Sequence, residues 1–181
     1  ESLGRKQYLI MKKELNQART DSYADYIFAV NGDFNDSRPD NMVMQLGKGS
    51  AGSGNRNFSS DLRITDNQWH YVSVSYDPTA AADRQLRFIR DGVIDYQGTG
   101  SFTPGENDGE VLIGAHMDAG NVFNATLDGK IDELRISSGR AAPSELLDSR
   151  LANSSTRGWW RFEGGSPGGT ASGDAGAISD Y

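Results

Sequence analysis

The stretch ITDNQWHYVSVSYDPTAAADRQLRFIRDGV, residues 64–93, decides the fold of this chain. From Trp69 to Asp77 successive side chains are expected on opposite faces, with Val72 and Val74 on the same face. A period of two residues is typical of a β-strand that buries one face against a core. The stretch therefore predicts a strand that begins at Trp69, with the indole packed in the core or at a strand edge.

A tight turn is expected at the end of this stretch. Residues 85–90 alternate again after an irregular loop at residues 77–84, and Asp91-Gly92 comes directly after them. Asp-Gly accepts the positive φ angles that a two-residue hairpin turn requires. The stretch therefore predicts two antiparallel strands and, after the turn, a third at residues 93–96.

The composition of the whole chain favours the same architecture. Its 181 residues suffice for one domain with a sizeable core, and its 22 glycines supply many turns between short strands. We predict an all-β fold, an antiparallel sandwich of two sheets. The expected core residues are Trp69, Val72, Val74, Leu86, Phe88, Leu112, Ile131 and Leu134.

Further strands are expected where short apolar or alternating runs lie between turn residues. They cover residues 6–12, 23–30, 41–46, 58–64, 110–115, 121–125 and 131–136. One short helix is expected near the C-terminus, because Ser144 is a capping residue that precedes apolar residues at positions 146, 147 and 151.

Several motifs, taken in order, resemble those of laminin-G-like domains, which belong to the concanavalin A-like jelly-roll class. The motifs are the Trp-His pair at 69–70, Asp-Gly at 91–92, VLIGAHMD at 111–118 and LDGKIDELRISSGRAAPSEL at 127–146. The resemblance covers residues 7–151 and implies that the predicted sandwich is a jelly roll.

The C-terminal segment, residues 153–181, is expected to be distinct from a laminin-G-like domain at residues 1–152. Its GWWRFEG run at 158–164 is similar to the opening strand of laminin-G-like units, and the N-terminus lacks such a strand. The run therefore either completes the sheet of this domain or opens a following unit, and the order of Asp174 and its neighbours slightly favours the second. With a first residue that is not Met, this predicts a piece of a larger, multidomain protein.

The charge of the chain disfavours nucleic acid and membranes as partners. Asp plus Glu number 25 against 18 Lys plus Arg, and the net charge of −7 opposes binding to phosphates or to an anionic membrane surface. The sequence has no run of 18 apolar residues and no cysteine, so neither a membrane span nor a disulfide is expected. The resemblance to laminin-G-like domains implies a glycan or an extracellular protein as the partner, and a secreted or cell-surface location.

No residues show a catalytic spacing. Laminarinase-type glycosidases of the jelly-roll class need two carboxylates on one face, about 5 Å apart, whereas Asp132 and Glu133 are adjacent and point to opposite faces of the expected strand. The histidines are His70 and His116, too few for a zinc site and outside a nucleophile-elbow context, and His70 is expected to be a packed strand residue with a satisfied hydrogen bond. The glycine-rich residues 47–57 lack the spacing of a P-loop. The chain is therefore predicted not to be an enzyme.

Calcium is the cofactor that the resemblance implies, as a structural ion near the rim of the sheet. Its carboxylate ligands would come from Asp132 and, where the tail folds onto this sheet, from Glu163 and Asp174. The alternative is that Asp132 caps a turn or pairs with Lys130 or Arg135.

A non-catalytic carbohydrate- or protein-binding module is the leading interpretation, because binding is what remains when catalysis is set aside. A glycoside hydrolase or its accessory domain, and a structural spacer, are the alternatives. Sugar recognition uses planar polar groups in loops beside an aromatic surface. The candidate ligand-binding residues are Asn35, Asp36, Arg38, Asn57, His116, Asp118 and Asn121. Trp159 and Trp160, like Trp69, are expected to pack in the core or at strand edges.

Overall fold

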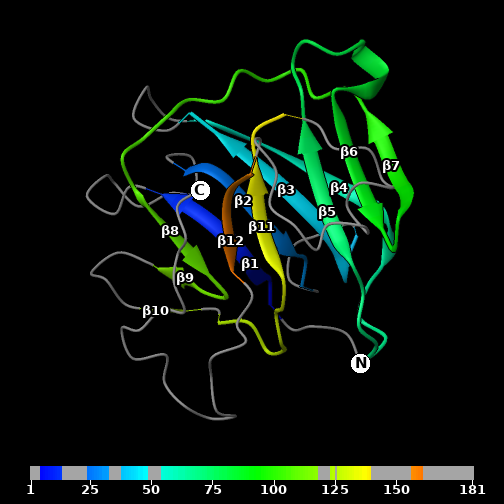
Figure 1. Ribbon diagram of the computed structural model, residues 1–181, viewed down its shortest axis with the longest axis vertical. Coiled ribbons are helices and arrows are strands. Elements are labelled where there is room, and N and C mark those ends of the chain that lie inside the picture. The colour runs from blue at the N-terminus through cyan, green and yellow to red at the C-terminus, as the bar shows by residue number, and fades with distance from the viewer. Residues whose placement is uncertain are drawn as a thin grey trace. The chain divides into compact units, whose positions relative to one another are not determined.

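The computed structural model describes residues 5–13, 24–32, 38–48, 54–117, 123–124, 126–139 and 156–160 (Figure 1). Regular structure in these residues is β-strand apart from one short 3-10 turn, Ala82–Arg84. The chain divides into two compact units, Glu1–Gly129 and Lys130–Tyr181. Within the described ranges, no helix is both long and apolar enough to span a bilayer.

The larger sheet of the first unit has five antiparallel strands in the order β4-β3-β2-β1-β8. They are β1 (Gln7–Lys13), β2 (Ala24–Val30), β3 (Asn41–Gly47), β4 (Asn55–Arg63) and β8 (Glu110–Ile113). Their register aligns one apolar row across the whole sheet, formed by Ile113, Ile10, Phe28, Met44 and Phe58. The next row contains Leu112, Met11 and Ile27 and faces the other way, so the central strands carry apolar side chains on both faces.

The smaller sheet of this unit has three antiparallel strands in the order β5-β6-β7, drawn in green in Figure 1. They are β5 (Val72–Tyr76), β6 (Leu86–Arg90) and β7 (Val93–Gly98). The turn between β6 and β7 consists of Asp91 and Gly92, with φ angles of 51° and 81°. The hairpin turn predicted from the Asp-Gly dipeptide is therefore confirmed.

The two sheets of the first unit contact each other through aromatic side chains. The ring of Phe88, on β6, is fully buried, and its centroid lies 6.5 Å from that of Phe28 on β2. Tyr96, on β7, packs on the same ring at 6.1 Å. Both ring pairs are tilted, and rings at these separations gain from burial and from contact with each other. The predicted all-β sandwich of antiparallel sheets is confirmed.

Polar contacts also tie the outer edge of β4 to the smaller sheet. The backbone N–H of Leu62 donates to Oδ2 of Asp95 over 3.3 Å, and Nη1 of Arg90 donates to the carbonyl of Arg63 over 2.9 Å. These bonds satisfy backbone groups that an edge strand otherwise leaves open to pairing with another chain.

The predicted core is confirmed in its centre and wrong at one end. Leu86 and Phe88 are fully buried, and Leu112 packs against the core cluster of the larger sheet. Trp69, however, is 68% exposed. The reason is that β5 begins at Val72, so the indole belongs to the preceding turn and not to a strand face. The remaining predicted core residues, Val72, Val74, Ile131 and Leu134, are partly buried.

The second unit contains one antiparallel strand pair among its described residues. It joins β11 (Leu134–Ser137) to β12 (Thr156–Trp160). The Trp-Trp run thus pairs with a strand of its own chain, although the boundary at residue 152 and the role of residues 153–181 in a following unit stay predictions. The helix predicted after Ser144 lies outside the described residues. In the first unit, a further short pair joins β9 (His116–Met117) to β10 (Phe123–Asn124).

Candidate functional site

His70 joins two turns that are distant in the sequence. Its Nδ1 atom lies 2.8 Å from Oδ2 of Asp91, and its Nε2 atom lies 2.9 Å from Oδ1 of Asp66. An ionised carboxylate only accepts hydrogen bonds, so a ring that bonds to two of them needs a proton on each nitrogen. The geometry therefore favours the imidazolium form of His70.

The pKa values of these three groups are displaced in the directions that this ion-pair geometry requires. Hydrogen bonds to Asp91 and then to Asp66 raise the pKa of His70 above its usual value of 6.5. The hydrogen bonds from His70 and from the N–H of Gln68 lower the pKa of Asp66 below 3.8. Burial alone would raise the pKa of Asp91, but its bonds to His70 and to the N–H of Tyr71 reverse that effect and lower it.

Hydrogen bonds from backbone N–H groups hold in place both the turn that contains Asp66 and the turn that contains Asp91. Oδ1 of Asp91 accepts from the N–H of Tyr71 over 2.9 Å, and the N–H of Asp91 donates to the carbonyl of Tyr71 over 2.8 Å. Oδ1 of Asp66 accepts from the N–H of Gln68 over 3.0 Å. Asn67 between them has a φ of 62°, a left-handed conformation that Asn tolerates better than most residues. The segment Asp66–His70, called here the Trp69 turn, therefore has a defined shape.

The Trp69 turn presents polar groups together with one large aromatic surface. Trp69 is exposed, and so are the carboxamide side chains of Asn67 and Gln68. The side chains of Asp66 and Asp91 are about half exposed, at 53% and 49%, whereas that of His70 is only 14% exposed. The imidazolium thus supports the turns from within while the indole, the amides and the carboxylates face solvent.

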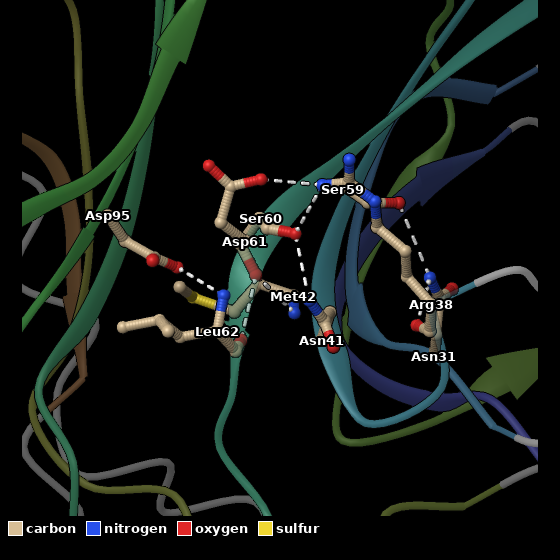
Figure 2. A network of polar contacts seen from close by, with 9 residues as sticks. All are labelled: Asn31, Arg38, Asn41, Met42, Ser59, Ser60, Asp61, Leu62 and Asp95. Carbon is tan, nitrogen blue, oxygen red and sulfur yellow. Dashed lines mark hydrogen bonds and ion pairs between the residues drawn. The ribbon is translucent and has the colours of Figure 1, made fainter.

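A second polar network lies where β3 and β4 run together, and Figure 2 shows its members. Nη1 of Arg38 donates to Oδ1 of Asp61 over 2.7 Å and to the carbonyl of Ser60 over 3.1 Å. Nδ2 of Asn41 donates to the same carbonyl over 2.8 Å, and the hydroxyl of buried Ser60 accepts from the N–H of Met42 over 2.9 Å. These bonds replace ladder bonds at the irregular end of the β3–β4 pairing, between Asn41 and Val43.

The three predicted ligand-binding residues that the structure describes lie in different parts of the first unit. Arg38 is engaged by this network, and Asn57 is an exposed residue of β4 paired with Gln45. His116 is buried, with its ring centroid 4.5 Å from that of Tyr8. The other predicted ligand-binding residues, Asn35, Asp36, Asp118 and Asn121, lie outside the described residues.

Asp132 is the one predicted calcium ligand that the structure describes. It is exposed, and its Oδ1 accepts from the N–H of Glu133 over 2.9 Å, while Glu133 has a φ of 51°. Both residues precede β11, with Glu133 in a bend, and do not lie within the strand where the sequence placed them. The alternative that Asp132 caps a turn agrees with this geometry. Glu163 and Asp174 lie outside the described residues, so calcium binding stays a prediction.

Sequence reasoning missed the exposed indole and the two-sided bonding of His70. Alternation from Trp69 onward resembled a strand, although the run Asp66-Asn67-Gln68 directly before it begins with two turn-forming residues, Asp66 and Asn67. That run was the available signal that the chain reaches β5 only after the Trp-His pair. The contact between His70 and Asp91 has no local signal, because it depends on how β5 pairs with β6.

Comparisons with known proteins identify one family. The family model described as the concanavalin A-like lectin/glucanases superfamily matches residues 12–146. No curated protein and no solved structure matches the chain.

Proposed function

Because the chain belongs to the concanavalin A-like lectin/glucanase superfamily, we propose that it is a non-catalytic module that binds carbohydrate. The superfamily includes both binding proteins and glycosidases, so the choice between them depends on what the carboxylates of this chain do. We place the module in a larger secreted or cell-surface protein, with an extracellular protein as the alternative partner.

The observation that carries this proposal is the pairing of carboxylates with basic groups. Oδ2 of Asp25 lies 2.9 Å from Nζ of Lys12, and Asp61 lies 2.7 Å from Arg38. Asp66 and Asp91 share the imidazolium of His70. The contacts with His70 favour the ionised form of Asp66 and Asp91.

A retaining or inverting glycosidase requires the opposite arrangement. Its general acid is a carboxyl group whose pKa is raised, so that it keeps a proton to give to the leaving oxygen. The pKa values of Asp66 and Asp91 are instead lowered by their hydrogen bonds to His70 and to backbone N–H groups. This direction favours a structural role for both residues over acid catalysis.

The test compares binding and hydrolysis with one protein preparation. The 181-residue chain would be run in affinity gels containing neutral and anionic polysaccharides, and the same polysaccharides would be assayed for new reducing ends. Retarded migration without hydrolysis is expected. Release of reducing ends that disappears in an Asp132→Asn, Glu133→Gln double variant would replace the proposal with a glycosidase. The same gels with and without a chelator test whether calcium takes part.

A further inference from the structure

Trp69 is largely exposed to solvent, although an aromatic side chain gains from burial. Its neighbour His70 is largely covered, whereas 68% of Trp69 is open to water. An aromatic side chain of this size can bury roughly 150–250 Å² of surface, so exposing it forgoes a large favourable term. Single exposed apolar residues are common on proteins and need no explanation by themselves. The setting of Trp69 is what distinguishes it.

The first part of that setting is rigidity. The Trp69 turn is closed by the bond from Gln68 to Asp66 and is tied to the β6–β7 turn by the two bonds of His70. A further pair of bonds between Tyr71 and Asp91 fixes the same junction. A ligand that docks on this turn meets a preformed backbone, so little conformational entropy is lost on binding.

The second part of the setting is chemical. Immediately before the indole in the chain come two exposed carboxamides, those of Asn67 and Gln68, which both donate and accept hydrogen bonds. An aromatic ring among planar hydrogen-bonding groups suits a ligand with an apolar face and a rim of hydroxyls. A protein hot spot would instead call for a contact that can be fully desolvated, with apolar groups around the ring.

The third part of the setting is charge. Two half-exposed carboxylates, Asp66 and Asp91, flank the imidazolium of His70, and the positive charge of Arg90 acts on Asp91, so the junction of the turns itself is close to neutral. The whole chain carries a net charge of −7. The net negative charge of the chain therefore disfavours uronic acid and sulfated sugars and does not oppose uncharged sugars.

From these three observations we infer that the Trp69 turn is a binding site for a neutral glycan, with a pyranose ring stacked on Trp69 and its hydroxyls bonded to the amides of Asn67 and Gln68. The inference rests on the proposed function and adds the place of binding and the class of sugar. Trp69 contributes the apolar surface, the two amides set the orientation, and His70 acts only as a positioning residue.

The experiment uses the complete chain and four variants in affinity gels and isothermal titration with a soluble β-glucan, a xylan, a galactomannan, polygalacturonate and heparin. Trp69→Ala should weaken binding to the neutral polysaccharide by about tenfold or more. Trp69→Phe should retain most of it, because a ring is still present. An Asn67→Gly, Gln68→Ala double variant should weaken binding to the same neutral polysaccharide and leave the melting temperature nearly unchanged, because Gly adopts the positive φ of residue 67 without strain.

Val111→Ala is the matched control, because it removes a surface apolar side chain from β8, in the other sheet. This control should bind like the unaltered chain. The melting temperature of Trp69→Ala should also equal that of the unaltered chain, since the side chain it removes is mostly in water.

The outcomes separate this inference from the proposed function. If the unaltered chain binds a neutral polysaccharide and Trp69→Ala binds it equally well, the function stands and the site is elsewhere. Preference for polygalacturonate or heparin would contradict the class of sugar. If no polysaccharide binds but Trp69→Ala abolishes self-association in analytical ultracentrifugation, the turn is a protein contact and both proposals fail.

Discussion

His70 and Asp91 are 2.8 Å apart at Nδ1 and Oδ2, and this contact joins the turn before β5 to the turn after β6. The same carboxylate holds the backbone of Tyr71 through its other oxygen. The side chain of Asp91 therefore connects the end of the smaller sheet to the segment that carries the exposed indole. The charge states of Asp91 and His70 set the strength of this connection.

The stability contributed by His70 should depend on pH in a defined window. Because its pKa is raised in the folded state, this contribution is complete below the unfolded value of 6.5 and is lost as pH rises through the higher folded value. The pKa values of Asp66 and Asp91 are lowered, so their contributions are complete above 3.8 and are lost as pH falls through the lower folded values. The three contributions coincide between pH 3.8 and 6.5.

The measurement is the difference in melting temperature between the unaltered chain and His70→Gln across pH 3 to pH 10. This difference should be largest in that window and should shrink toward alkaline pH. An Asp95→Asn variant, which changes a carboxylate that does not contact His70, controls for the general effect of charge. A difference that does not vary with pH would show that His70 stabilises the fold only by packing.

Replacing Phe88 should strongly destabilise the first unit. Its ring is fully buried and contacts Phe28 and Tyr96. Phe88→Ala should therefore lower the free energy of unfolding by about 3–5 kcal/mol, measured by chemical denaturation. Val93, in the neighbouring strand, is 69% exposed. Val93→Ala should therefore change the free energy of unfolding by less than about 0.5 kcal/mol. Equal effects from both would mean that the sheets do not pack through Phe88.

Gly32 should not tolerate even a methyl group. A Cβ atom at this position would overlap the backbone of Arg5, and backbone atoms cannot move aside as the end of a side chain can. Gly32→Ala should therefore lower the melting temperature clearly. Gly129→Ala is the control, because the nearest atom to its Cβ would be Cγ of Leu127 at 3.7 Å, an ordinary contact. An unchanged melting temperature for Gly32→Ala would show that the backbone of Arg5 does not lie against Gly32.

Removing the hydroxyl of Ser60 should lower the free energy of unfolding, although the hydroxyl is a small group. The hydroxyl accepts from the N–H of Met42 over 2.9 Å and donates to the carbonyl of Leu62 over 3.2 Å, and Ser60 is fully buried. Ser60→Ala leaves the buried N–H of Met42 without its acceptor, which should lower the free energy of unfolding by about 1–3 kcal/mol. Ser101→Ala, at an exposed loop position, should have almost no effect in the same denaturation experiment. Similar losses for the two variants would argue against the network in Figure 2.

Local signals account for much of what the sequence predicted correctly. Asp-Gly at the β6–β7 turn has a conformational preference of its own, and the structure has both residues at positive φ. Alternation located β2 and β3 to within a residue or so at each end. These features depend on neighbouring residues alone.

Features that depend on distant segments could not be predicted in the same way. Whether Trp69 is buried is decided by where β5 starts to pair with β6, and period-two alternation does not fix that point. The partners of His70 lie 4 and 21 residues away, on opposite sides of it in the chain. The pairing of β11 with β12 likewise brings together segments with no shared local pattern.

The apolar row that crosses the larger sheet has a consequence for how the chain acquires its structure. The ribosome makes Ile10 before its neighbour Ile113 on β8, and the strands β2 to β7 are made between them. Until then one side of β1 has unsatisfied peptide groups, and pairing across so long a separation raises the contact order and slows the rate-limiting step. A nascent chain stalled before residue 110 would expose the unpaired edge of β1, which can pair with other chains. The chain should therefore depend more on chaperones during synthesis than the finished molecule does on refolding.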